Sequence, residues 1–427
     1  MSDQINAVIL AGGRGTRSAN PSLPKILQEI YPGFTLLDQH LENLILINPS
    51  KVVFALSFGA EEIILKLSSA NYIKYPFKII WEIESEPVGT ASAVLSVKKH
   101  LDSEDVLIIL GDTAINTDYK HYYSIWSSSN TKLGIFCHPN LHPEDSDVLE
   151  VSNDRKVIKF WPKHEDRSIS YPLRALTGSY FLKNFLLDST SGNCGNTDLA
   201  RYLISVIPTL DDLLPINTSS YFADTGTAQR LQRVQEDYKS GAYARRGKSN
   251  LGAILIDRDG CLMPDIPEGR KSISNSDFEE ETISEIRRAN LMGIPIFLVT
   301  NQPAVAKGFL QLNDVENIQM ESERILAAHG AILDDFMYCS HHPDSGFEGE
   351  VSDLKISCSC RKPKSGMAVE LAKWHGFSLK ESVVIGDSEN DRGLADSIGA
   401  RFFFGRHSHH EVGKALGKSI ELLSDNF

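Results

Sequence analysis

Two aspartates one residue apart, Asp257 and Asp259, follow the short apolar run Leu251–Ile256. Such a run predicts a buried strand, and the side-chain period of two places both carboxylates on one face. Gly260 comes next and lets the backbone turn away. Acidic side chains at the carboxyl end of a buried strand lie where open α/β sheets bind ligands. An acidic Asp-Gly turn at the surface explains the pair alone equally well, so the rest of the chain must decide.

Two later runs repeat this arrangement. Ile294–Val299 predicts a strand that ends in the polar triplet Thr300–Gln302, whose groups suit hydrogen bonds to a phosphoryl oxygen. Ser382–Ile385 predicts a further strand that ends at Asp387, and Lys362 lies between these two strands in the sequence. Together the three strand ends supply the acid, base and metal-binding groups that phosphoryl chemistry requires. Chemistry at the aspartate pair is therefore favoured over a plain turn.

Metal-binding side chains crowd the segment before Lys362. Of the six cysteines in the chain, three fall within residues 339–360. In a reducing compartment such crowding favours metal binding over disulfides. A Cys-x-His pair followed by a Cys-x-Cys pair offers four mixed nitrogen and sulfur ligands, which is typical of a structural zinc site. The predicted ligands are Cys339, His341, Cys358 and Cys360, with His342 as an alternative to His341.

The beginning of the chain holds a second candidate site. Ile5–Leu10 predicts a buried strand that runs into a glycine-rich loop, and backbone N–H groups of such loops converge on anions. Arg14, Arg17 and Lys25 can neutralise a triphosphate. The spacing matches neither a Walker loop nor the dinucleotide fingerprint. The predicted nucleotide-binding residues here are Leu10, Ala11, Gly12, Gly13, Gly15, Thr16, Arg17 and Lys25.

Two further segments extend this first site. The stretch Glu86–Ala91 precedes a helix predicted to reach about Leu101, and Gly89 permits close approach to a flat ring while Thr90 caps the helix. The apolar strand Val106–Leu110 ends at Asp112, and Asp224 follows a later apolar run. Because Mg²⁺ prefers one or two carboxylates together with substrate phosphates, the sequence predicts a magnesium site. Glu86, Gly89, Thr90 and Asp112 join the predicted nucleotide site, and Asp112 and Asp224 are its predicted Mg²⁺ ligands.

Size and composition limit the interpretation. A chain of 427 residues exceeds one ordinary core and predicts two domains, and strands alternate with helices as in α/β proteins. The small, polar and basic segment 239–250 predicts a linker, which gives domains at 1–238 and 251–427. A net charge of −13 argues against nucleic-acid binding. The first residues lack the pattern of a signal peptide and no apolar run reaches membrane-spanning length, so we expect a cytoplasmic protein.

On these motifs the first part of the chain, to about residue 240, resembles the sugar-1-phosphate nucleotidyltransferases. The matching pieces are Leu10–Arg17, Pro24-Lys25, Glu86–Ala91, Gly111-Asp112 and Asp224–Gly226. The resemblance implies a Rossmann-like fold and Mg²⁺-dependent attack of a sugar 1-phosphate on a nucleoside triphosphate. Arg17 and Lys25 would then offset charge on the leaving pyrophosphate.

The sugar side departs from that family's pattern. Its Glu-Lys-Pro motif reads Phe160–Lys163 here, and its Asn-Ala-Gly motif reads Leu176–Gly178. Ser18 follows Arg17 where the family usually has Leu or Met. Lys163, shifted by one residue, is our candidate for the lysine that binds the sugar phosphate.

Residues 251–427 resemble the phosphatases of the haloacid-dehalogenase type. The zinc loop that runs directly into Arg361–Pro363 makes D-glycero-D-manno-heptose 1,7-bisphosphate phosphatases the most similar branch, with histidinol-phosphate phosphatases next. Cys261 and Ser388 depart from that branch, which usually has Thr and often Lys there. The predicted fold class is therefore α/β with two Rossmann-like domains, a nucleotidyltransferase fold followed by a phosphatase fold with a zinc loop.

The second resemblance implies roles for the strand-end residues. Asp257 would be the nucleophile and Asp259 the general acid and base, with Thr300 and Lys362 stabilising the phosphoryl charge. Mg²⁺ would be bound by Asp257, Asp387 and Asp259, the last through its carbonyl. The remaining predicted contacts to substrate phosphate are Asn301, Arg361, Lys362 and Lys163.

The two resemblances predict a bifunctional enzyme. Dephosphorylation of a heptose 1,7-bisphosphate at C7 would supply the sugar 1-phosphate for nucleotidyl transfer, and the pairing implies GTP as donor and GDP-heptose for surface polysaccharide. Two alternatives stay open: a hexose-1-phosphate nucleotidyltransferase fused to a different phosphatase, or a first half that senses nucleotides without catalysis. The expected partners are sugar phosphates and nucleoside triphosphates, with Mg²⁺ in both domains, structural Zn²⁺ in the second, and homo-oligomerisation left open.

Overall fold

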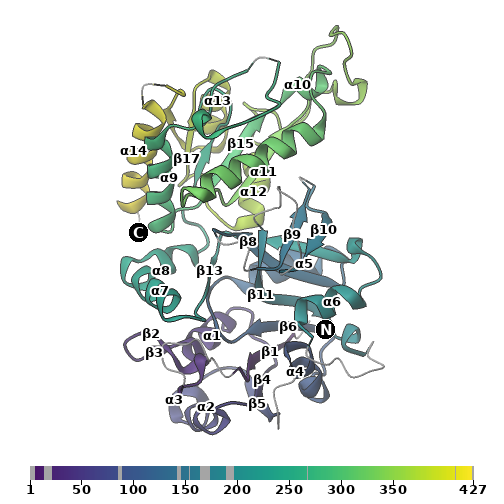
Figure 1. Ribbon diagram of the computed structural model, residues 1–427, viewed down its shortest axis with the longest axis vertical. Coiled ribbons are helices and arrows are strands. Elements are labelled where there is room, and N and C mark those ends of the chain that lie inside the picture. The colour runs from purple at the N-terminus through teal and green to yellow at the C-terminus, as the bar shows by residue number, and fades with distance from the viewer. Residues whose placement is uncertain are drawn as a thin grey trace.

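The computed structural model describes residues 5–13, 22–84, 89–141, 146–152, 154–163, 174–188, 197–266, 268–408 and 410–425. The described chain forms two large sheets, each with helices on both faces, and two small two-stranded sheets (Figure 1). The N-terminal sheet lies in the lower half of that view and the C-terminal sheet in the upper half. Both parts thus have the predicted Rossmann-like α/β arrangement, which confirms the predicted fold class.

The N-terminal sheet has nine strands and a mixed topology. Its parallel centre joins the strands that begin the chain, with β1 between β4 and β6, while β11 runs antiparallel to β6. The strands in sheet order are β10 (Val157–Trp161), β9 (Val148–Val151), β11 (Arg174–Lys183), β6 (Asp105–Leu110), β1 (Asn6–Ala11), β4 (Lys51–Leu56) and β5 (Lys78–Ile83), with β8 (Leu133–Pro139) beside β11 and β12 (Leu213–Asn217) beside β8. Two small sheets pair β7 (Thr113–Asn116) with β13 (Tyr221–Asp224) and β2 (Glu29–Tyr31) with β3 (Phe34–Thr35).

The centre of this sheet is buried on both faces. Successive residues of β1 point alternately into two apolar cores, with Ala7 and Ile9 in one and Val8 and Leu10 in the other. A continuous apolar run is the sequence pattern that such a strand requires. The helices of this part are α1 (Leu36–Leu44), α2 (Ala60–Leu67), α3 (Ala70–Ile73), α4 (Thr90–Val97), α5 (Tyr119–Ser127), α6 (Leu199–Val206), α7 (Ala228–Ser240) and α8 (Ala242–Arg246).

The C-terminal sheet has five parallel strands in the order β16-β15-β14-β17-β18. Its central strand β14 again divides its side chains between two cores, Ile254 and Ile256 on one side and Leu255 on the other. The strands are β14 (Ile254–Ile256), β15 (Ile296–Asn301), β16 (Asp335–Cys339), β17 (Val383–Gly386) and β18 (Arg401–Phe404). The helices are α9 (Glu280–Leu291), α10 (Pro303–Ala306), α11 (Leu312–Ala328), α12 (Gly366–His375), α13 (Glu389–Ile398) and α14 (Glu411–Asp425).

The segment predicted as a linker is largely helical. Helix α7 continues to Ser240, Gly241 takes a left-handed conformation with φ of 85°, and α8 follows at once. Arg245 of α8 is buried and donates a hydrogen bond of 2.9 Å to the carbonyl of Leu423. A small, polar composition did not prevent helix formation because tertiary contacts, such as this one with α14, stabilise these turns. The division into 1–238, 239–250 and 251–427 remains our proposal.

Within the described ranges, every helix is too short or too polar to cross a bilayer.

Candidate active sites

The carboxyl ends of β14, β15 and β17 meet at one edge of the C-terminal sheet. These strands are neighbours and parallel, so Asp257 and Asp387, which follow β14 and β17, lie at the same edge as Thr300 near the end of β15. Gly260 has φ of 83°, and a β-carbon there would lie 2.6 Å from an oxygen of Asp387. The glycine thus permits the turn that brings the first strand's aspartates against the third strand.

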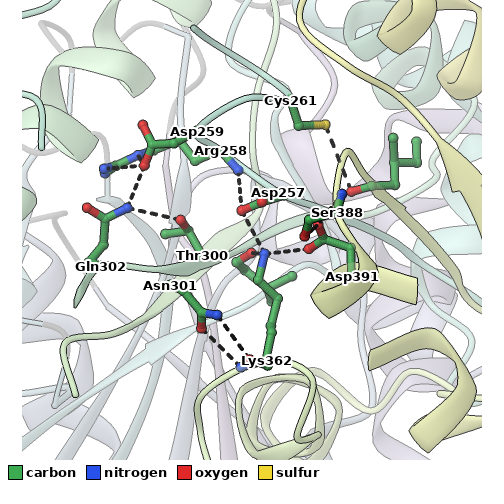
Figure 2. Close-up of polar contacts among 12 residues, drawn as sticks. Asp257, Arg258, Asp259, Cys261, Thr300, Asn301, Gln302, Lys362, Ser388 and Asp391 are labelled. Atoms are coloured by element: carbon green, nitrogen blue, oxygen red, sulfur yellow. Dashed lines mark hydrogen bonds and ion pairs between the residues drawn. The ribbon is translucent and has the colours of Figure 1, made fainter. Parts of the chain in front are cut away.

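Lys362 lies at the centre of this site with 2% of its surface exposed (Figure 2). Its Nζ atom is 2.7 Å from Asp257 Oδ1 and 2.6 Å from Asp391 Oδ1, and it donates a hydrogen bond to the Val299 carbonyl. Burial works to lower the pKa of Lys362, but the two carboxylates overcome it and raise that pKa above its usual value. The ammonium group therefore stays charged beside the predicted nucleophile.

Asn301 holds the backbone of that lysine. Its Nδ2 donates to the Lys362 carbonyl at 3.1 Å, and its Oδ1 accepts from the Lys362 N–H at 3.0 Å. We had expected Asn301 to contact substrate phosphate directly. Because both polar atoms are engaged with the backbone, we instead propose Asn301 as a residue that positions Lys362.

Three carboxylates form a candidate cation site. One oxygen from each of Asp257, Asp387 and Asp391 lies within 4.8 Å of the others. Burial raises the pKa of Asp257 to about 7, with Asp391 adding to the shift against the attraction of Lys362. Burial and Asp391 also raise the pKa of Asp387. Mutual repulsion of buried carboxylates is what a divalent cation would relieve, so this donor set fits Mg²⁺.

Asp259 points to different partners. Its Oδ2 accepts hydrogen bonds from Arg258 Nε at 3.1 Å and from Gln302 Nε2 at 2.6 Å (Figure 2). Gln302 also donates to Thr300 Oγ1 at 3.0 Å. The carboxylate of Asp259 is thus outside the three-aspartate group, in keeping with the prediction that it would reach a cation only through its carbonyl.

The sequence predicts no role for Arg258 or Asp391, and it predicts only a hydrogen bond to a phosphoryl oxygen for Gln302, whose amide instead contacts Asp259 and Thr300. Each adjoins a predicted strand end, which was the available signal, but a polar neighbour of a motif is more often exposed than engaged. Arg258 is 1% exposed although it separates the two aspartates. The two departures noted in the sequence serve packing and capping: Cys261 is fully buried, and Ser388 forms a capping box with Asp391 at the start of α13.

The predicted zinc ligands converge. Cys339, which ends β16, lies 3.5 Å from His341 Nδ1 and 3.5 Å from Cys358 Sγ, and Cys360 Sγ lies 3.3 Å from His341 Nδ1. The four donor atoms all lie within 4.8 Å of one another, a set that fits tetrahedral Zn²⁺. His342 instead turns its Nδ1 toward the backbone of Asp344. The geometry therefore favours His341 as the fourth ligand.

The candidate site of the N-terminal part lies at the carboxyl edge of β1 and β6. Lys25 Nζ is 2.7 Å from Asp112 Oδ2. Thr225 donates its hydroxyl to the Asp112 carbonyl at 2.7 Å, and strand pairing places Asp224 opposite Thr113. Asp112 lies in the turn before β7, and Asp224 ends β13, the strand paired with β7, where it forms an ion pair with Arg230. Two carboxylates at this edge fit a cation that takes its other ligands from phosphate and water.

A buried histidine supports this edge. His40 Nε2 lies 3.3 Å from the Gly111 carbonyl, and burial lowers the pKa of His40 to about 4, so the ring is neutral. Gly12 approaches the next strand closely, since a β-carbon there would lie 3.1 Å from Ser57. Five predicted residues lie outside the described residues: Arg14, Gly15, Thr16, Arg17 and Glu86. Leu10 and Ala11 end β1 at the site, and Gly13 comes shortly after them.

The prediction that Thr90 caps its helix was wrong. The N-cap of α4 is Gly89, with φ of 110°, and no side chain caps it. Thr90 Oγ1 accepts a hydrogen bond of 2.8 Å from the N–H of Leu199, so the hydroxyl joins α4 to α6. A tertiary partner has replaced the local one. Lys163 follows β10, and its N–H donates to Asp147 Oδ1 at 2.6 Å.

Comparison with known proteins gives matches in both parts. Residues 6–241 match the family model described as nucleotidyl transferase. The chain is 34% identical over 149 residues, 35% of its length and 77% of the relative, to D-glycero-beta-D-manno-heptose-1,7-bisphosphate 7-phosphatase of Haemophilus influenzae. It is 30% identical over 180 residues to the protein of that name from Photorhabdus laumondii, covering 41% of this chain and 93% of the relative. A crystal structure of HddC from Yersinia pseudotuberculosis has 23% identity and a TM-score of 0.44, covering 55% of this chain and 99% of that one.

Proposed function

We propose that this chain, which belongs both to the nucleotidyl transferase family and to the family of heptose-1,7-bisphosphate 7-phosphatases, catalyses two consecutive steps in nucleotide-sugar synthesis. The first removes the C7 phosphate from D-glycero-D-manno-heptose 1,7-bisphosphate. The second transfers a nucleotidyl group to the resulting heptose 1-phosphate and releases pyrophosphate. The pairing of the two families supports a GDP-heptose product, so GTP is the donor to test first.

The observation that carries the phosphatase assignment is the contact of Lys362 with both Asp257 and Asp391 at the carboxyl edge of a parallel sheet. Asp257 attacks phosphorus in line, and the sugar oxygen leaves as the aspartyl-phosphate forms. Asp259, oriented by Arg258 and Gln302, gives its proton to that oxygen and later takes one from the attacking water. Thr300 and Lys362 hold the phosphoryl oxygens. Asp257, Asp387 and Asp391, with the Asp259 carbonyl, would hold Mg²⁺, which would offset the charge of the phosphate ester.

Nucleotidyl transfer needs no covalent intermediate. A phosphate oxygen of the sugar 1-phosphate attacks the α-phosphorus of the nucleotide, and positioning with charge neutralisation supplies most of the catalysis. Lys25 and Arg17 neutralise the leaving pyrophosphate, and Lys163 holds the sugar phosphate. Asp112 and Asp224 would hold Mg²⁺, whose charge would offset that of the triphosphate.

The test separates the two activities in one protein. Wild-type protein with Mg²⁺ is given each anomer of the heptose bisphosphate, inorganic phosphate is followed, and then GTP, CTP, UTP or ATP is added and pyrophosphate is followed. We expect phosphate from one anomer and pyrophosphate with one nucleotide. Asp257→Asn should abolish phosphate release but keep pyrophosphate release from heptose 1-phosphate, and Asp112→Asn should do the reverse.

Two results would reject the proposal. Phosphate release from histidinol phosphate but not from the heptose bisphosphate would sink the assignment of the first substrate. Failure to release pyrophosphate with any sugar 1-phosphate, in protein that is an active phosphatase, would sink the assignment of the second.

A further inference from the structure

The two domains meet through a set of buried ion pairs. Arg174, at the start of β11, makes two hydrogen bonds to the Glu323 carboxylate on α11, at 2.9 and 3.0 Å, and both residues are less than 10% exposed. Arg246 of α8 pairs with Asp334 at 2.5 Å. Paired, fork-shaped contacts of arginine with carboxylate fix orientation as well as distance. The N-terminal domain therefore docks on the second domain in one defined way.

A third arginine brings the β9–β10 hairpin into this interface. Arg155 lies in the turn between these strands, and its Nη2 donates a hydrogen bond to Asp335 Oδ2 at 3.0 Å. The guanidinium group of Arg155 lies 4.1 Å from the centre of the Trp374 ring. Asp335 also accepts a hydrogen bond from His375 Nε2 at 2.9 Å. The tip of an N-terminal hairpin is thus held by residues of the C-terminal domain, where β9 and β10 face α11 and α12 in Figure 1.

Among the described residues, the rest of that face of the hairpin borders a cleft. The cleft, of about 320 Å³, separates the hairpin from α11, with Ser152 and Ile158 on the hairpin side and Asn317 and Met320 on the helix side. Ile158 remains 52% exposed. Because the cleft leaves this face unpacked, its attachment to the second domain depends chiefly on the arginine contacts.

The β9–β10 hairpin and β11 also contact residues beside the proposed nucleotidyltransferase site. Asp147, just before β9, accepts from the N–H of Lys163 with its side chain and from the N–H of Leu176 with its backbone carbonyl. Gly178, two residues further on, packs so closely on Leu110 that a β-carbon would lie 2.6 Å from that side chain. Leu110 ends β6 and precedes Gly111 and Asp112. A shift of β11 or the hairpin would therefore move groups beside the proposed cation site.

We propose that the phosphatase domain completes the sugar side of the nucleotidyltransferase site, with Arg155 and Arg174 as positioning residues held by Asp335 and Glu323. The proposal rests on the proposed function, which places the sugar phosphate at Lys163. The phosphatase site should not depend on these contacts. Asp335 begins β16 and Cys339 ends it, so the interface and the zinc loop lie at opposite ends of a strand about 13 Å long.

The experiment compares two substitutions on one helix. Glu323→Gln removes the charge that faces Arg174, while Glu321→Gln removes an exposed charge that pairs with Arg324 on α11. We expect Glu323→Gln to raise the KM for the sugar 1-phosphate roughly ten-fold, which corresponds to about 1.4 kcal/mol, because the hydrogen bonds from Arg174 lose their charged partner. The KM for the nucleotide and the phosphatase kcat/KM should stay within about two-fold, and Glu321→Gln should resemble wild type in both assays.

A second pair of variants tests the hairpin and guards against misfolding. Arg155→Ala should raise the same KM, and Arg155→Lys, which keeps the charge but not the planar contact with Trp374, should restore part of the loss. Hydrogen exchange of residues 148–161 should quicken in Glu323→Gln and Arg155→Ala. Phosphatase activity in the same samples reports that the C-terminal domain remains folded.

Distinct results overturn the proposal or its premise. Faster exchange in the hairpin with an unchanged KM for the sugar 1-phosphate would overturn the positioning role, as would unchanged exchange. If wild type transfers no nucleotidyl group to any sugar 1-phosphate, the proposed function fails. Faster exchange would then still support the holding of the hairpin by the second domain, and unchanged exchange would reject it.

Discussion

Asp391 uses its two carboxylate oxygens for different partners. Oδ1 accepts from Lys362 Nζ at 2.6 Å, and Oδ2 accepts from the N–H of Ser388 at 3.1 Å. The Asp391 side chain thus fixes both the Lys362 ammonium group beside the nucleophile and the first turn of α13. Gly386 makes room for it, because a β-carbon there would lie 2.2 Å from the Asp391 carboxyl carbon.

Replacing Asp391 by Asn should lower phosphatase activity by about 10–100-fold and raise the Mg²⁺ concentration needed for half-maximal rate. The amide can still cap the helix but leaves the buried Lys362 with one anionic partner. Phosphate release against Mg²⁺ concentration measures the effect. Asp396→Asn, an exposed position on the same helix, is the control. Equal Mg²⁺ dependence in the two variants would contradict the role of Asp391.

At the scale of elements, the zinc loop determines how β16 is joined to α12. The loop leaves β16 at Cys339 and returns through Cys358 and Cys360 to Lys362. The backbone of Lys362 is held on the other side by Asn301. The cysteine–histidine cluster and one asparagine therefore place the central lysine from two directions.

Loss of the zinc site should remove phosphatase activity and leave nucleotidyl transfer intact. His341→Ala deletes a converging nitrogen, whereas His342→Ala deletes a neighbour that faces the backbone of Asp344. We expect His342→Ala to retain one zinc per chain by elemental analysis and His341→Ala to lose it, because closed four-ligand sites fail when a ligand is missing. One zinc per chain in His341→Ala would show that another residue supplies the ligand.

For the whole molecule, the interface makes two domains one structural unit. Asp335 is buried, which by itself raises its pKa, but Arg155, His375 and Arg174 overcome this and hold the pKa well below its usual range. Burial lowers the pKa of His375, so the ring is neutral at pH 7 and contributes a hydrogen bond instead of a charge. The charge on Asp335 is therefore balanced by the two arginines of the other domain.

Asp335→Asn should reduce the free energy of unfolding by about 3–5 kcal/mol at pH 7, the cost of breaking a buried ion pair. A carboxyl whose folded pKa is depressed stabilises the fold above its unfolded pKa near 4, and this contribution is lost as pH falls towards the folded pKa. The difference between wild type and variant should thus be constant above about pH 5 and shrink below pH 4. Urea denaturation across pH measures it, with exposed Asp211→Asn as control. A difference that grew on acidification would refute the assignment.

The strands and the reactive residues at their ends could be predicted from the sequence because strand-end motifs are local. Apolar runs of four to six residues that end in polar groups predicted β1, β6, β14, β15 and β17, and the structure has strands there within a few residues. The spacing of two cysteine-containing pairs likewise predicted the zinc cluster. The predicted capping by Thr90 was wrong because a distant partner, the N–H of Leu199, replaced the local preference.

The sequence alone determined which residues can do chemistry and at the ends of which strands they lie. The tertiary structure alone decided their partners: that Asn301 holds a backbone, that Asp391 shares Lys362 with Asp257, and that Arg174 meets Glu323. These pairs are 29 to 149 residues apart in the chain. Periodicity reaches only across one helix or strand, whereas such contacts arise when separate elements pack, so no local pattern encodes them.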